Sequence, residues 1–255
     1  MSTVSTPLAD SAIMLRRNLK HTLRNPTTMF NAVLFPIVMM LMFVKVFGGA
    51  FNVGPDVDYI DYATPGLLVM AVSYGLGATA TAVNDDMTKG IINRFKTMDV
   101  SRGAMLTGHV VVTTVRCLVA CAAIIGVAFA MGFDPDASAV DWLGVIGLVV
   151  LLSFAAGWLT VAMGLAAKTA ESAGMAAVPL VMLPFLSSAF VPADTMGTGV
   201  RQFVEYQPFT PIIETLRGLL GGDLSTGDAI AALAWCVGLA VLGYVWAVST
   251  FKKRA

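Results

Sequence analysis

The sequence predicts an all-α integral membrane protein with six transmembrane helices, an N-terminal amphipathic interface helix and short re-entrant or surface helices before the last span. Three observations support this fold class. Of the 255 residues, 57% are hydrophobic and 13% are charged, which is about half the charge of a soluble domain. Several apolar stretches are long enough to cross a bilayer. Lysine and arginine are distributed unequally between these stretches.

Six apolar stretches have the length of a membrane span. A helix that crosses about 30 Å of hydrocarbon needs about 20 apolar residues. The stretches lie at approximately residues 28–48, 63–83, 109–131, 142–166, 173–192 and 229–250. They are continuous rather than alternating, which excludes transmembrane β-strands. Pro179 and Pro184 predict kinks in the fifth span. We therefore expect a cytoplasmic segment at 1–27, a six-span domain at 28–250 and a basic tail at 251–255.

The orientation follows from the basic residues. If the N-terminus is inside, the inner segments contain 12 of the 16 lysines and arginines, whereas the outer segments contain Arg201 and Arg217. The positive-inside rule then places both termini in the cytoplasm. Residues 1–27 are polar, and the first apolar run is too long for the apolar region of a signal peptide.

Residues that could form a catalytic or metal site are scarce. Cys117, Cys121 and Cys236 lie in apolar runs and are interpreted as packing residues. His21 and His109 have no companion ligands at metal-binding spacing. The sequence contains neither a G-x-x-x-x-G-K-[ST] phosphate loop nor a G-x-S-x-G elbow at a strand-to-helix turn. We expect a non-catalytic chain without a cofactor or metal of its own, so any active transport takes its energy from an ion gradient or a partner.

A charged stretch, "NDDMTKGIINRFKTMDVSRGAMLTGH", occupies residues 84–109 between the second and third spans. Its acidic start and basic end predict a helix from Asp85 to about Lys96, with Ser101 as the N-cap of the next helix. Apolar residues at helical spacing also predict an amphipathic helix in the N-terminal segment, which Asn25 and Pro26 end. The helix in 84–109 could lie on the lipid surface or bind a groove of another protein, and the N-terminal helix is expected along the inner face of the membrane.

Two further features concern the membrane domain. The stretch "VRQFVEYQPFTPIIETLRGLLGG" predicts two short helices around Pro208 and Pro211, which either enter the outer leaflet or lie on its surface. Arg116 lies inside the third span. It either contacts an anionic substrate group or gating partner, or extends along the helix to reach cytoplasmic water.

The chain resembles the membrane subunit of ABC-2 type transporters, a bacterial permease class that includes daunorubicin-resistance exporters. The resemblance covers roughly residues 8–252 and rests on motifs in the same order. "LRRNLKHTLRNPTTMFNAVLFPIVMMLMF" looks like the interface helix and first span of this family. The stretch 84–109 is similar to its cytoplasmic segment, although Asp99 stands where a proline is usual, and "QPFTPIIETLRGLLGG" resembles the segment before the last span.

The resemblance implies an exporter permease of the bacterial plasma membrane, with a hydrophobic drug, lipid or glycolipid-type substrate. Two copies of a separate cytosolic P-loop ATPase would bind ATP-Mg and drive transport. The permease would pair with a second copy of itself or a related permease, in contact with membrane lipids and without nucleic acid. An ion-coupled secondary transporter is the alternative, although the spans contain almost no carboxylates. An enzyme acting on lipids is a third hypothesis, but it lacks a catalytic cluster.

Two sets of candidate residues follow. The residues expected to couple the chain to the ATPase are Arg16, Arg17, Arg24, Asp85, Asp86, Lys89, Gly90, Arg94, Phe95 and Arg102. The residues that could line a substrate path or form a gate are Arg116, Pro208, Pro211, Glu214 and Arg217.

Overall fold

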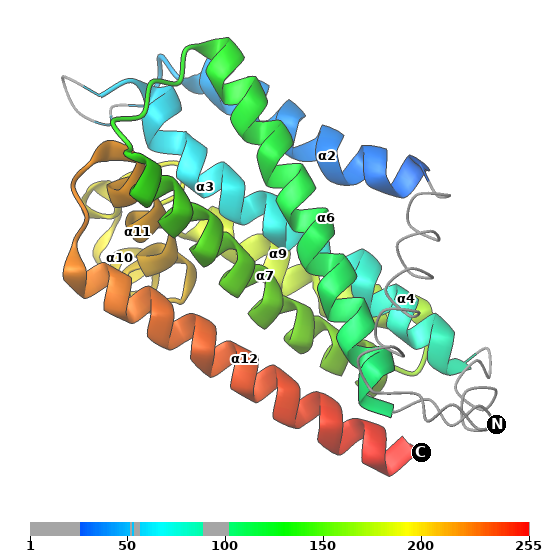
Figure 1. The fold of residues 1–255 in the computed structure, drawn as a ribbon. Helices are drawn as coiled ribbons and strands as arrows, with labels where there is room; N and C mark the ends of the chain where they lie inside the picture. The colour runs from blue at the N-terminus through cyan, green and yellow to red at the C-terminus, as the bar shows by residue number, and fades with distance from the viewer. Residues whose placement is uncertain (1–25, 52, 54–56, 89–101, 255) are drawn as a thin grey trace.

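The computed structural model of the protein describes residues 26–51, 53, 57–88 and 102–254. Within these ranges the chain forms helices joined by turns and loops, with no strand, so the all-α prediction is confirmed. The helices form a bundle with two ends (Figure 1). At the Asp86 end, α4 (Leu76–Thr88) ends, α6 (Arg102–Met131) begins and α12 (Thr226–Arg254) ends. At the Arg217 end, α3 (Tyr59–Tyr74) begins and α11 (Phe209–Gly221) precedes α12.

Four helical segments are long and apolar enough to cross a membrane. They are α3 with α4 over Tyr59–Thr88, α6 over Leu106–Met131, α7 over Ala139–Ala166 and α12 over Thr226–Lys253. Each exceeds the length of about 20 residues that a bilayer requires. These helices coincide with the predicted second, third, fourth and sixth spans and extend beyond most of the predicted boundaries.

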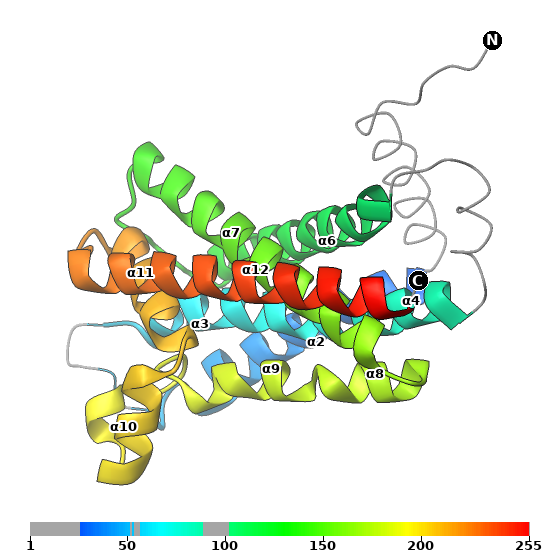
Figure 2. The ribbon, with the colours of Figure 1, turned by 90° about the horizontal axis from the view of Figure 1, so that it is seen from below.

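The predicted first and fifth spans form different structures. α2 (Pro26–Leu41) continues into a π-helix, η1 (Met42–Phe47). The fifth stretch is divided into α8 (Ala170–Ala176), α9 (Val178–Met182) and the 3₁₀-helix η2 (Leu183–Leu186), and Figure 2 shows α8 and α9 in line. Pro179 and Pro184 lie at the starts of α9 and η2, where a missing N–H is tolerated. The apolar parts of both segments are shorter than the four long helices, so the count of six spans stays a prediction.

Two short helices precede α12, as the sequence predicts. They are α10 (Thr198–Tyr206) and α11, with Pro208 at the N-cap of α11 and Pro211 in its first turn. Nine of the 13 residues of α11 are buried, so this helix packs inside the bundle. α11 ends at Gly222, whose φ of 75° lies in the left-handed region that glycine adopts without a steric penalty.

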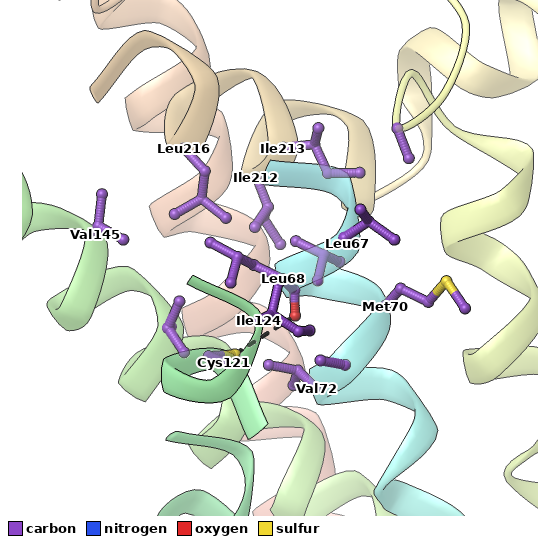
Figure 3. Close-up of a cluster of buried hydrophobic side chains, with 14 of the residues drawn as sticks. Leu67, Leu68, Met70, Val72, Cys121, Ile124, Val145, Ile212, Ile213 and Leu216 are labelled. Carbon is purple, nitrogen blue, oxygen red and sulfur yellow. Dashed lines mark hydrogen bonds between the residues drawn. The ribbon is translucent and has the colours of Figure 1, made fainter. Parts of the chain in front are cut away.

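The main hydrophobic core surrounds α3, which packs against α2, α6, α7 and α11. Figure 3 shows Leu67 and Leu68 of α3 facing Ile124 of α6 and Ile212 of α11. The Cys121 thiol lies 3.6 Å from the carbonyl oxygen of Leu68. All three cysteines are free and buried, which confirms their interpretation as packing residues.

α12 lies at the edge of the bundle. Only 17% of its apolar window is buried, compared with 72% for α7. Gly243 permits a close approach between the two helices, since a Cβ at this position would lie 2.5 Å from the backbone nitrogen of Leu159. The Trp158 and Tyr244 rings also meet edge to face, with centroids 4.9 Å apart. The remaining apolar surface of α12 is exposed, as expected for a helix in contact with lipid.

Local sequence explains several helix ends. Ser138 and Asp141 form a capping box at the start of α7, and Thr169 and Ser172 form another at the start of α8. These pairs satisfy backbone N–H groups that a helix start leaves without partners. Near the C-terminus, α12 continues through Arg254, so most of the predicted tail at 251–255 is helical.

Candidate functional site

A cavity of about 510 Å³ opens at the Arg217 end of the bundle. Its walls come from four segments: the start of α3, the loop between α6 and α7, α11, and the turn before α12. An added Cβ at Gly218 would lie 2.7 Å from the carbonyl oxygen of Asp223. A glycine at this position therefore lets the turn fold back against α11.

The cavity is strongly acidic. The charged residues among those that line it are Asp58, Asp61, Asp134, Asp136, Glu214, Asp223, Asp228 and Arg217. The Asp61 carboxylate accepts a hydrogen bond from the backbone N–H of Asp134 at 3.3 Å, which ties α3 to the loop between α6 and α7. Because one guanidinium faces seven carboxylates, the potential in the cavity is negative and favours cations.

Arg217 joins three segments at the wall of this cavity. Its Nη1 lies 2.5 Å from Oε1 of Glu214, one turn earlier in α11. Its guanidinium carbon lies 3.8 Å from the centroid of the Tyr62 ring, in a cation–π contact. Its Nη2 also donates hydrogen bonds to the carbonyl oxygens of Ser188 at 2.9 Å and Tyr62 at 3.2 Å. One side chain thus holds α11, α3 and the loop after η2 together.

Two tyrosines of α3 fix the same loop. The Tyr62 hydroxyl donates to the carbonyl oxygen of Ser188 at 2.9 Å, and the Tyr59 hydroxyl donates to that of Phe190 at 3.2 Å. The Phe190 ring stacks on Phe43 of η1, with centroids 4.0 Å apart. The loop after η2, which lies within the predicted fifth span, is therefore bound to both α3 and η1.

A second group of polar side chains lies between α4 and α6, toward the Asp86 end. Asp86 Oδ2 lies 3.2 Å from His109 Nε2. Deeper in the bundle, the Thr79 and Thr113 hydroxyl groups lie 2.7 Å apart. Arg116 donates from Nη2 to the carbonyl oxygen of Gly75 and, at 2.8 Å, to the Thr79 hydroxyl. α4 is therefore attached to α6 by polar contacts along most of its length.

α4 also makes polar contacts with α7 and α8. The Asn84 amide donates to the carbonyl oxygens of Gly164 at 3.1 Å and Ala167 at 2.8 Å, at the C-terminus of α7. The Thr81 hydroxyl donates to the carbonyl oxygen of Ala170 at the start of α8, at 3.3 Å. Asn84 thus satisfies two of the carbonyl groups that the end of α7 leaves free.

The predicted coupling residues fall partly within the described ranges. Asp85 and Asp86 lie in the last turns of α4, rather than at the start of a separate helix as the sequence indicated. Carboxylates near a helix C-terminus face the negative end of its dipole, and His109 provides Asp86 with a partner there. Arg102 is the first residue of α6. The candidates outside the described residues are Arg16, Arg17, Arg24, Lys89, Gly90, Arg94 and Phe95.

The residues predicted for a substrate path or gate do not form one group. Glu214 and Arg217 line the cavity and contact each other. Pro208 and Pro211 begin α11 and are not among the residues that line it. Arg116 is likewise absent from the cavity wall and is half-buried against Gly75.

Sequence reasoning missed the partners of these groups. Tyr62 carries the cation–π contact with Arg217 from 155 residues away, and neither residue has a local motif that indicates the other. His109 has no companion nearby in sequence, because Asp86 approaches it from the preceding helix. Asn84 stands out as an amide at the end of an apolar stretch, which was the available signal for a polar contact within the bundle.

Comparisons with known proteins agree with this architecture. The family description "ABC-2 type transporter" matches residues 11–220. A daunorubicin resistance ABC transporter permease protein of Streptomyces coeruleorubidus is 29% identical over 215 residues, which cover 84% of this chain and 76% of the relative. A probable doxorubicin resistance ABC transporter permease protein of Mycobacterium tuberculosis is 24% identical over 243 residues, which cover 92% of this chain and 85% of the relative.

The family match covers residues 11–220, so it includes Arg217 with its contacts and the polar groups between α4 and α6, whereas Asp223 and Asp228 of the cavity lie beyond it. The relatives are named as permease proteins, and the four long apolar helices are those of a multi-pass membrane protein. The chain therefore belongs to the ABC-2 type transporter family and is a membrane subunit of an ABC transporter.

Proposed function

We propose that this chain is the permease subunit of an exporter that moves a hydrophobic drug outward across a bacterial plasma membrane. The observation that carries this proposal is the match to the family over most of the chain, together with relatives named for daunorubicin and doxorubicin resistance. A lipid or a glycolipid-type molecule is the other cargo class. The energy comes from two copies of a separate P-loop ATPase, which bind ATP-Mg, and the permease acts as a pair with a second copy or a related chain.

The proposed orientation places the Asp86 end in the cytoplasm. Lys168, Lys252 and Lys253 lie at this end, whereas carboxylates surround the cavity at the other end. This distribution follows the positive-inside rule and supports cytoplasmic termini. The acidic cavity then faces the exterior.

Two further helical segments complete six spans in this proposal. α2 with η1 forms a helical stretch over residues 26–47, which is long enough to cross. The segment from α8 to η2 covers residues 170–186 and is about 25 Å long at 1.5 Å per residue. A span of this length requires local thinning of the bilayer or support from the adjoining loop, which Tyr59 and Tyr62 hold.

The acidic cavity supports a preference for positively charged amphiphilic cargo near the outer end of the route. Its carboxylates would attract a cation and repel an anion of the same shape. Export of a cationic fluorescent amphiphile should therefore exceed that of a matched anionic one. Equal export of the two dyes would remove this part of the proposal.

The proposed contact with the ATPase lies at the cytoplasmic end. Asp85, Asp86 and Arg102 lie at this end of the bundle. The other coupling residues in this proposal are the candidates that the sequence analysis named. Charge reversal at Arg94 together with Asp86 should weaken the association with the ATPase by at least about 30-fold and reduce export accordingly, since truncating a paired charge in an interface typically costs 2–5 kcal/mol. Arg201→Glu provides a control, because this exposed residue lies on α10 and pairs with Glu205.

The test is co-purification of the chain with a candidate P-loop ATPase subunit from the same organism, followed by ATP hydrolysis in lipid nanodiscs with and without daunorubicin. We expect a stable complex whose hydrolysis rate rises with the drug. An ion-coupled carrier would instead transport without the ATPase and stop when an uncoupler collapses the ion gradient. That result would overturn the proposed function in favour of the alternative.

A further inference from the structure

The second long helix is interrupted at Gly75, near its middle. α3 ends at Tyr74 and α4 begins at Leu76. The N–H of Gly75 is directed to the carbonyl oxygen of Ser73 rather than to the carbonyl four residues earlier, as an α-helix requires. The regular hydrogen-bond ladder is thus broken at one residue, and a broken ladder is an established cause of helix bending.

Arg116 of α6 binds the helix at this interruption. Its Nη2 donates to the carbonyl oxygen of Gly75 and to the hydroxyl of Thr79, one turn further along α4. An added Cβ at Gly75 would lie 3.4 Å from Nε of Arg116, so the guanidinium lies directly against the glycine. Arg116 therefore bonds to the backbone at the interruption and to the first turn of α4 at the same time.

Arg116 retains an unused donor in this arrangement. Its Nε is buried and has no hydrogen-bond partner among the described residues. A buried donor without a partner is costly, and the cost is higher for a charged group. A second orientation of α4 that placed an oxygen atom within reach of this donor would remove that cost, which gives the guanidinium a physical reason to exchange partners.

The halves on either side of Gly75 are held by different contacts. α3 is enclosed by apolar side chains of the main core. α4 has fewer buried residues: Ala80 and Val83 pack closely against α7, and hydrogen bonds of Thr79, Thr81 and Asn84 reach partners on α6, α8 and α7. Hydrogen bonds of this kind can be exchanged one at a time, whereas displacement of α3 would disturb the whole core.

We propose that Gly75 is a joint in the second span and that Arg116 is the positioning residue that holds α4 in one of two orientations relative to α3. The two orientations of α4 about Gly75 should exist in the isolated chain, without the ATPase or cargo. Its use, the transfer of ATPase movement to the outer half of the bundle, rests on the proposed function.

The test uses the full-length chain in lipid nanodiscs, without ATPase or cargo. One pair of nitroxide labels at Thr88→Cys and Lys253→Cys reports the position of α4, and a second pair at Val140→Cys and Ile230→Cys reports the opposite end of the bundle. All four positions are exposed, while the native cysteines are buried and so react poorly. Pulsed electron paramagnetic resonance then measures the distance distribution of each pair.

Arg116→Met removes the hydrogen bonds and keeps an unbranched side chain. We expect it to raise the population of a second distance in the Thr88–Lys253 pair about tenfold relative to the main one, because hydrogen bonds to charged groups contribute about 1.5–3 kcal/mol. Arg116→Lys keeps the charge and one donor and should restore part of the original distribution. The Val140–Ile230 distribution should not change in either variant.

Gly75→Ala tests the joint independently, since a Cβ at this position makes only an ordinary contact at 3.4 Å. It restricts the backbone and should narrow the Thr88–Lys253 distribution. Gly126→Ala in α6 is the matched control, because a Cβ there meets nothing within 4 Å. The joint is refuted if Arg116→Met and Gly75→Ala leave the Thr88–Lys253 distribution unchanged, or if Arg116→Met broadens both label pairs equally. Loss of ATPase binding with an intact joint would count against the proposed function instead.

Discussion

α3 and α4 are consecutive halves of one apolar segment, yet different interactions hold them. In α3, 14 of 16 residues are buried, and its closest neighbours are apolar side chains. In α4, five of 13 residues are buried, and two of these, Thr79 and Asn84, form hydrogen bonds to other helices. Close packing resists small displacements in all directions, whereas hydrogen bonds fix a helix only at particular atoms. The comparison therefore separates a rigid half that the core encloses almost completely from a less enclosed half that relies more on hydrogen bonds.

The largest expected effects come from substituting glycines at which another segment approaches α3 or α4 closely. A Cβ at Gly66 of α3 would lie 2.6 Å from Cβ of Ala189, and one at Gly164 of α7 would lie 2.6 Å from the carbonyl oxygen of Ala80 in α4. Gly66→Val and Gly164→Val should each destabilise the protein by about 3 kcal/mol through overpacking. Detergent unfolding of the purified chain, followed by tryptophan fluorescence, measures the loss.

The matched control for both variants is Gly147→Val, because a Cβ at Gly147 has no neighbour within 4 Å. It should change stability by less than about 0.5 kcal/mol. If Gly66→Val were tolerated as well as the control, the rigid packing assigned to α3 would be wrong.

Arg217 gives the next largest effect. Arg217→Met removes the cation–π contact with Tyr62 and the hydrogen bonds to two carbonyl groups, and it leaves Glu214 without its partner. We expect a loss of about 2–3 kcal/mol in the same unfolding measurement. Tyr62→Phe keeps the ring beneath the guanidinium and removes only the bond to Ser188, so it should cost about 1 kcal/mol. Equal losses in the two variants would contradict the role assigned to Arg217.

A comparison of Asn84→Ala with Cys121→Ala tests the difference between the halves directly. Asn84→Ala leaves two carbonyl groups at the end of α7 without a donor and should cost about 1–2 kcal/mol. Cys121→Ala removes a weak thiol contact of α3 together with a small apolar group, and should cost about 1 kcal/mol. Hydrogen exchange should rise in α4 for the first variant and in α3 for the second. Exchange that rose in both helices for either variant would show that the two halves move together.

The smallest expected effect concerns Asp86 and His109, 3.2 Å apart near the C-terminus of α4. A double-mutant cycle with Asp86→Asn and His109→Ala should give a coupling energy of about 0.5–1 kcal/mol in unfolding experiments, the size expected for one hydrogen bond between two side chains. A coupling energy near zero would mean that the contact between these two residues does not attach α4 to α6.

The sequence predicted which helices form better than it predicted the residues at which they begin and end. The apolar runs indicated the four long helices, but the second was expected at 63–83 and is observed over Tyr59–Thr88. It continues past Asp61 at one end and Asp85 at the other, because a helix does not stop where hydropathy falls. Pro208 and Pro211 correctly indicated the boundary between α10 and α11.

The candidate site was predicted only in part. Glu214 and Arg217 were named as candidates, and both line the cavity. Their contact with each other is local, since residues three apart are neighbours on a helix. The carboxylates opposite them come from α3 and from the loop between α6 and α7, and no local pattern connects these segments. Arg116 was noticed as an isolated charge, whereas its contact with Gly75, 41 residues earlier in the chain, was not foreseen.

The sequence by itself determined the fold class, the positions of the long helices and the unequal distribution of charge, because each depends on the cost of placing residue types in lipid. Only the tertiary structure decided which polar groups meet: Arg116 with the interruption at Gly75, Arg217 with Tyr62, and Asp86 with His109. The physical reason is that hydropathy is a property of consecutive residues, whereas a hydrogen bond between helices depends on how each helix is rotated and packed against its neighbours.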